Sequence, residues 1–153
     1  SKTEGNRGNN NKSASSSMIT NISISKMGKI IIATESCVHV FRLNGVHICG
    51  KQLNEKILFT HVSPDSRFIV IVTQFLVTGF WLHNFDILQT FCLVDKKMSE
   101  SIIESAAGTV LVNSNVTSSA LTKRGDALFI GLENGTILGI NCKLNWQRLP
   151  KKV

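Results

Sequence analysis

Four thiol and imidazole side chains lie close together in the sequence and could bind a zinc ion: Cys37, His39, His47 and Cys49. Thiolate sulfur and imidazole nitrogen are the ligands that zinc takes in structural sites. The pair Asn44-Gly45 between them predicts a two-residue hairpin turn that sets His39 opposite Gly50. In that register the first two ligands point from one face of the hairpin and the last two from the other. We therefore expect core cysteines and edge or interface histidines, and only a one-residue register slip would assemble a zinc site.

The same hairpin is apolar on both faces, as a sheet packed between two other sheets would be. One predicted face carries Cys37, Phe41, Leu43, Val46 and Ile48, and the other carries Val38, Val40 and Cys49. We expect both faces to be covered by neighbouring sheets.

Three aspartates are the next candidates for chemistry: Asp65, Asp86 and Asp126. A catalytic pair needs two carboxylates aimed at one site, whereas these recur beside turn residues and favour a role in forming turns. His61 and His83 lie near Ser63 and Asp86, but the sequence contains no G-x-S-x-G elbow, P-loop or G-x-G-x-x-G motif. We expect no enzymatic activity, no metal and no cofactor.

The segment Ile57–Phe91 predicts the elements around which the chain is built. It contains four short apolar runs separated by turns, two of which are marked at 63–66 and 83–84. The run Phe68–Val72 is wholly apolar, which is typical of a strand buried on both faces. Four short antiparallel strands around such a strand form one blade of a β-propeller.

The flanking segments repeat this plan, with Ile30–Ala33 and Ala127–Gly131 in the place of the central strand. The step from Met27 to Asp65 is close to the ~40 residues of a WD-type repeat. The predicted fold is all-β, a partial propeller of about three four-stranded antiparallel blades. The expected division is a disordered linker at 1–17, blades at about 18–53, 57–94 and 116–149, an insertion at 95–115 and a basic tail at 150–153.

Two segments outside the blade pattern are the candidate partner-binding regions. The insertion 95–115 contains a spacing that allows a short helix over 99–107 and an extra strand at 110–112. Near the C-terminal end, Trp146 lies beside Arg148 in the sequence and either fixes the tail to the last blade or contacts a partner. The candidate partner-binding residues are Lys96, Lys97, Met98, Trp146 and Arg148.

The formal net charge of +7 is concentrated at the two ends of the chain. Residues 1–17 carry +2 and residues 143–153 carry +4, which leaves +1 for the body. Basic ends attract phosphate weakly, so contact with an anionic membrane remains an alternative, whereas the near-neutral body makes nucleic acid a less favoured partner.

Four cysteines without a C-x-x-C pair, and an N-terminal segment without an apolar run, favour reduced thiols in the cytoplasm. No apolar run reaches the ~18 residues that a membrane helix needs. The chain does not begin with methionine, so we expect it to be cut from something longer.

Several motifs, in their order, resemble the C-terminal WD-repeat propeller of BEACH-domain proteins of the neurobeachin type. They are Ile22-Ser23-Ile24-Ser25, Phe41-Arg42-Leu43-Asn44-Gly45, Val62-Ser63-Pro64-Asp65-Ser66, Leu121-Thr122-Lys123-Arg124-Gly125-Asp126, Gly131-Leu132-Glu133-Asn134-Gly135-Thr136-Ile137 and the terminal Asn145-Trp146. The resemblance covers roughly residues 18–148. It implies a cytoplasmic scaffold, peripheral at internal membranes, that acts in vesicle trafficking and membrane-protein sorting, with a BEACH domain upstream and protein partners on the propeller rim.

The sequence also departs from the WD pattern. The Trp-Asp ending of a third strand is replaced by Phe41-Arg42, Trp81-Leu82 and Ile140-Asn141, and the opening Gly-His pair is absent. We expect the blades to depend on packing in place of the usual Asp–His–Ser hydrogen-bond network.

Three blades leave two sheet faces uncovered, which has an energetic consequence. If each face exposes roughly 500 Å² of apolar surface, the missing burial amounts to about 12 kcal/mol at ~25 cal/mol/Å². This rivals the ~5–15 kcal/mol stability of a whole domain. We expect the chain to belong to a larger propeller and to be unstable or self-associating alone.

Overall fold

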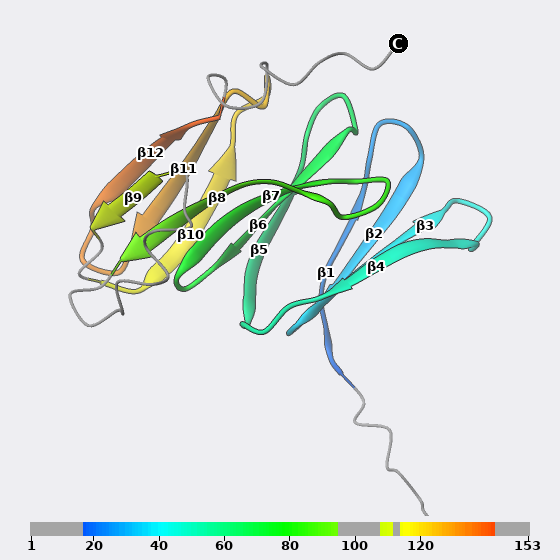
Figure 1. Cartoon of the computed structure of the whole chain (residues 1–153), viewed down its shortest axis with the longest axis horizontal. Coiled ribbons are helices and arrows are strands. Elements are labelled where there is room, and N and C mark those ends of the chain that lie inside the picture. Colours follow the sequence, from blue (N-terminus) through cyan, green and yellow to red (C-terminus); the bar gives the residue numbers. More distant parts are fainter. Residues whose placement is uncertain (1–16, 95–107, 112–113, 143–153) are drawn as a thin grey trace, which may run out of the picture.

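The computed structural model describes residues 17–94, 108–111 and 114–142, and everything described in it as regular structure is β-strand. Three sheets follow one another in chain order, with the second in the middle (Figure 1). The first sheet contains β1 (Ile19–Ile24), β2 (Lys29–Thr34), β3 (Cys37–Arg42) and β4 (His47–Gln52). The second contains β5 (Ile57–Val62), β6 (Phe68–Thr73), β7 (Leu76–Trp81), β8 (Ile87–Val94) and β9 (Gly108–Leu111). The third contains β10 (Val116–Leu121), β11 (Ala127–Leu132) and β12 (Ile137–Asn141).

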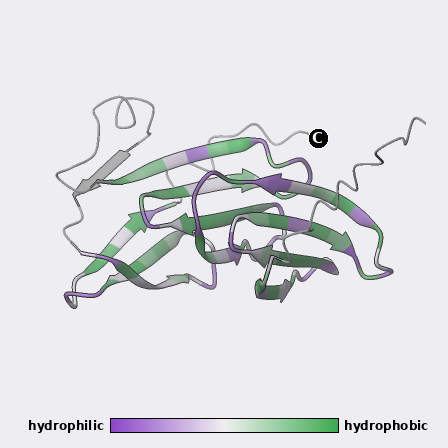
Figure 2. Cartoon of the chain, turned by 90° about the horizontal axis from the view of Figure 1, so that it is seen from below, coloured by the Kyte–Doolittle hydropathy of each residue, from purple (hydrophilic) through white to green (hydrophobic). Residues whose placement is uncertain are grey.

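Within each sheet, consecutive strands pair antiparallel, except that β9 joins the edge of β8 in parallel. The strands are formed by β-branched and aromatic runs, and polar residues gather at the turns between them (Figure 2). The parallel β9 confirms an extra strand near 110, and its bounds place it at 108–111. The helix expected over 99–107 and the fourth strand of the third blade lie outside the described residues.

One turn recurs between the first two strands of every sheet and is held by a hydroxyl group. Ser25, Ser63 and Thr122 each donate their amide to the start of the next strand and accept from a backbone amide through the side chain. A residue with positive φ closes each turn: Gly28 (72°), Ser66 (57°) and Gly125 (70°). Asp65 and Asp126 each accept a hydrogen bond from the hydroxyl of the same turn, at 2.6 and 2.5 Å, which confirms that these aspartates form turns.

The hydrophobic core consists of two joints between sheets. In the first joint, between the first and second sheets, Ile31 and Val40 pack with Ile69 and Ile71. In the second joint, between the second and third sheets, Val70 and Val72 pack with residues of β11 such as Ile130. Residues 69–73 are all buried because alternate side chains of β6 enter different joints. The prediction of a central strand buried on both faces is confirmed.

The recurring turn aligns the three sheets residue by residue. The amides of Ser25, Ser63 and Thr122 donate to the carbonyls of Lys29, Phe68 and Ala127, so these three residues are equivalent. Each sheet then has an upstream face, toward the preceding sheet, and a downstream face, toward the next. The upstream faces comprise Ile30, Ile32, Phe41 and Leu43 in the first sheet, Ile69, Ile71, Phe80 and Leu82 in the second, and Leu128, Ile130, Ile140 and Cys142 in the third.

Two sequence predictions about the β3–β4 hairpin are wrong. A register shift between Val40 and Phe41 sets Phe41 opposite His47, so His47 lies on the same face as His39. The same shift turns Ile48 toward the first joint, where it packs with Cys49, and not onto the face that carries Phe41. The predicted two-residue turn is also wrong, because the Gly45 amide donates to the Arg42 carbonyl and the Arg42 amide donates to the Val46 carbonyl, which makes the loop one residue wider. This wider turn sets the pairing of Phe41 with His47, and the register shift next to it restores the predicted pairing of His39 with Gly50.

Candidate functional site

The upstream face of the first sheet and the downstream face of the third are open. Ile22 and Ile24 of β1 are 59% and 67% exposed, and Leu43 is also exposed. Leu82 in the second sheet and Cys142 in the third are equivalent to Leu43, and both are at most 1% exposed. Figure 1 shows that no described element covers either open face. Of the two faces predicted to be covered on the β3–β4 hairpin, only the downstream one is covered by described residues.

The downstream face of the third sheet has a different character. It carries Phe129 and Ile137, which are exposed, between the small residues Ala120, Gly131 and Gly139. Its equivalents in the second sheet, Val70 and Val77, are buried in the second joint. Both ends of the array therefore present surfaces that match the buried ones within it.

Polar bridges cross both joints beside the apolar contacts. In the first joint, Asn21 donates its side-chain amide to Thr60 Oγ1 at 3.0 Å. In the second joint, His61 Nε2 and Ser119 Oγ are hydrogen-bonded at 2.6 Å. Thr60 and Ser119 occupy equivalent positions, because each pairs with the equivalent isoleucine of its sheet. These bridges add to the packing on which the blades were expected to depend, and the signal for them in the sequence was one hydroxyl at the same place in two repeats.

Burial lowers the pKa of the His61 imidazole below its usual value of 6.5. The unfolded chain therefore takes up a proton at a higher pH than the folded chain does. Stability contributed by neutral His61 is fully present above about pH 6.5 and declines as the pH falls through that value toward the folded pKa. We expect thermal melts between pH 7.5 and 5 to show this acid destabilisation, and His61→Gln to reduce the slope. An unchanged slope in that variant would contradict the assignment.

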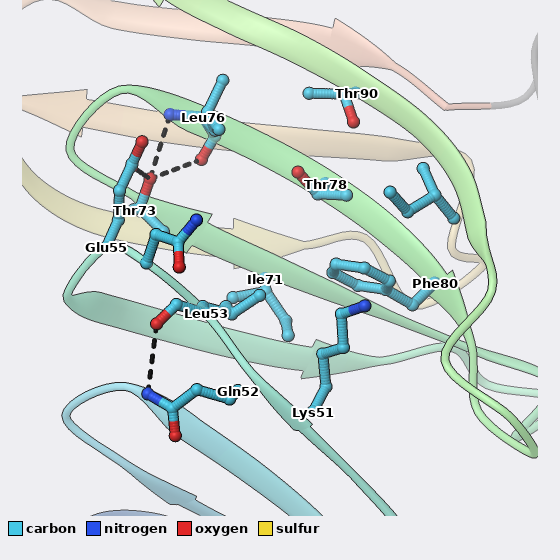
Figure 3. A pocket seen from close by; sticks show the side chains of 12 residues that line it. Lys51, Gln52, Leu53, Glu55, Ile71, Thr73, Leu76, Thr78, Phe80 and Thr90 are labelled. Atoms are coloured by element: carbon cyan, nitrogen blue, oxygen red, sulfur yellow. Dashed lines mark hydrogen bonds between the residues drawn. The ribbon is translucent and has the colours of Figure 1, made fainter.

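A hollow of 350 Å³ lies at the outer part of the first joint. It is bounded by Lys51 and Glu55 on one side and by Thr78 and Phe80 of the second sheet on the other (Figure 3). Ile87 of β8 also lines it. The Glu55 carboxylate accepts a hydrogen bond from the Thr73 hydroxyl at one end of the hollow. Charged and apolar side chains therefore share the walls of this hollow.

The zinc ligands considered from the sequence are divided by the fold. His39 and His47 are brought together, whereas the Cys49 thiol donates to the carbonyl oxygen of Leu82 at 3.5 Å in the first joint. Cys37 donates its thiol to the side-chain carbonyl of Gln52. Among the described residues there is no group of three or more metal-ligating side chains. Burial raises the pKa of the Cys142 thiol to about 11, as expected for a core cysteine.

All the candidate partner-binding residues lie outside the described residues: Lys96, Lys97, Met98, Trp146 and Arg148. Their segments directly follow β8 and β12. No described part of the chain forms a helix able to cross a membrane.

Comparison with known proteins places the fold. No family model and no curated protein match the sequence. Solved structures do match: KlHsv2 with loop 6CD replaced by a Gly-Ser linker, BamB from Moraxella catarrhalis, and the Cps50 (Swd1) β-propeller domain from Myceliophteria thermophila. Their TM-scores are 0.61, 0.56 and 0.60, at identities of 12%, 15% and 16%.

These alignments cover 82–83% of this chain but only 35–39% of the matched chains. At such low identity the likeness shows the fold alone. The chain is a partial β-propeller, and it spans 35–39% of the length of the structures it matches.

Proposed function

We propose that this chain is one part of a larger propeller ring that serves as a non-enzymatic protein-interaction scaffold. The observation that carries the proposal is the pair of open faces. Ile30 and Ile32 are equivalent to Ile69 and Ile71, which are buried in the first joint. Apolar residues at these positions are buried by a neighbouring sheet within the array. Further blades would therefore bury the exposed faces at its two ends.

We assign the scaffold to the BEACH type, acting in vesicle trafficking and membrane-protein sorting. The support is the ordered set of sequence motifs from Ile22 to Ile137, and the departures from the WD pattern do not interrupt that order. The proposed location is the cytoplasm, peripheral at internal membranes, with the BEACH domain upstream in the same polypeptide.

We place the partner contacts on the segments that follow β8 and β12. Loops at the ends of rigidly packed strands are the usual carriers of binding function. Lys96, Lys97 and Met98 combine two cations with an adaptable apolar side chain, a composition suited to an acidic amphipathic partner segment.

Substituting alanine at Lys96, Lys97 and Met98 in the full protein is expected to reduce co-purification of its partners several-fold. Alanine at Lys123 and Arg124, in the recurring turn of the third sheet, is the matched charge control and should leave it unchanged. Quantitative co-purification from cells measures both. Equal loss in the two variants would point to general charge and contradict a partner site in the insertion.

The alternative is a basic-tailed propeller that binds RNA or anionic lipid. It is favoured by one observation, that residues 1–17 and 143–153 carry +2 and +4 of the total +7. Salt-sensitive retention on RNA or on anionic vesicles, lost when these two segments are removed, would support this alternative over the protein scaffold.

A further inference from the structure

Two histidines on the open upstream face of the first sheet lie against each other. His39 Nδ1 and His47 Nε2 are 3.2 Å apart, and the ring centroids are separated by 5.3 Å. His47 is exposed and His39 is half-buried.

Three separate features of the hairpin produce this approach. The bulge at Phe41 moves His47 onto the face of His39. Gly50 leaves space beneath the His39 ring, because a Cβ there would lie 2.6 Å from Nδ1. The edge of the Phe41 ring meets His47 at a centroid distance of 5.0 Å and supports it from the side.

The separation of the two nitrogens suits a shared metal ion. Zinc binds imidazole nitrogen at ~2.0–2.1 Å in tetrahedral geometry, so two such nitrogens on one ion lie about 3.3–3.4 Å apart. The observed 3.2 Å is close to this value. A direct hydrogen bond between two neutral rings gives a similar distance, and the experiment below separates the two interpretations.

In the second sheet, the position equivalent to the histidine pair keeps an unfilled space although a neighbouring sheet packs on its upstream face. The second sheet carries the same register shift, and His39, Phe41 and His47 are equivalent to Thr78, Phe80 and Ile87. Those three residues line the 350 Å³ hollow at the outer part of the first joint. This step rests on the proposed ring, whereas the geometry of the histidine pair does not.

We propose that His39 Nδ1 and His47 Nε2 bind a zinc ion on the upstream face of the first sheet. The chain supplies two ligands, since no third metal-ligating side chain joins them among the described residues. Water or a group from a covering sheet completes the tetrahedron. Zinc is favoured because imidazole is one of its preferred ligands and the spacing fits tetrahedral coordination.

Zinc chloride titrated into the 153-residue chain, prepared without added histidines, tests the proposal by calorimetry. We expect one site per chain, with the zinc affinity at least about tenfold weaker in His39→Ala and in His47→Ala. His83→Ala is the matched control and should bind zinc as the unaltered chain does, because the His83 ring lies tilted against Trp81 and is not paired with a second histidine among the described residues. Circular dichroism checks that each variant is folded.

Histidine ring resonances give a second readout that a merely structural role would not move. Zinc should shift the nitrogen signals of His39 and His47 while those of His61 and His83 stay in place. Absence of binding, or binding that survives removal of both histidines and is lost in Cys37→Ser, would overturn the proposal. Neither result would bear on the scaffold function, which does not depend on a metal.

Discussion

Ile71→Ala is expected to lower the free energy of unfolding by about 2–5 kcal/mol, the usual cost of removing most of a buried isoleucine side chain. Ile71 is 1% exposed and packs in the first joint. The substitution removes apolar contact area and leaves a cavity that the rigid strands β5 and β7 cannot close. Urea denaturation at neutral pH measures the change.

The matched control is Ile32→Ala, because Ile32 holds the equivalent position on the open face of the first sheet. In this chain alone it should cost well under half as much as Ile71→Ala. In a polypeptide that includes the covering blade, the two costs should become similar. A small cost for Ile32→Ala in both settings would contradict the proposal that a further blade covers this face.

The isolated chain is expected to self-associate through its open faces. Replacing both Ile22 and Ile24 with lysine should restore the monomer, because a charged side chain cannot be buried there without a partner. Sedimentation velocity over a range of concentrations measures the association. If one open face exposes roughly 500 Å² of apolar surface, its burial contributes about 12 kcal/mol at ~25 cal/mol/Å², against which the entropic cost of association must be set.

Phe75→Lys is the control for this prediction. Phe75 is an exposed aromatic residue at the β6–β7 turn and does not belong to an open face. Association should persist in that variant. If it were lost there as well, general surface hydrophobicity and not the open face would be the cause.

The sequence predicted the strands and turns because their signals are local. Apolar runs such as Phe68–Val72 act through backbone preferences that need no distant contact. The pair Asn44-Gly45 correctly marked a hairpin, but the loop is one residue wider than the predicted turn. The predicted central segments Ile30–Ala33, Phe68–Val72 and Ala127–Gly131 lie within β2, β6 and β11. The two-sided burial of β6 also followed from its unbroken run of apolar residues.

Only the tertiary structure decided which residues meet. The wider turn and the register shift between Val40 and Phe41 set His47 beside His39 and turned Ile48 toward the first joint, because a one-residue change of register exchanges the faces of a strand. The bridge between His61 and Ser119 joins residues 58 positions apart. Alternation along a strand determines which side chains share a face. The stacking of the sheets determines what that face contacts, and it depends on residues far apart in the chain.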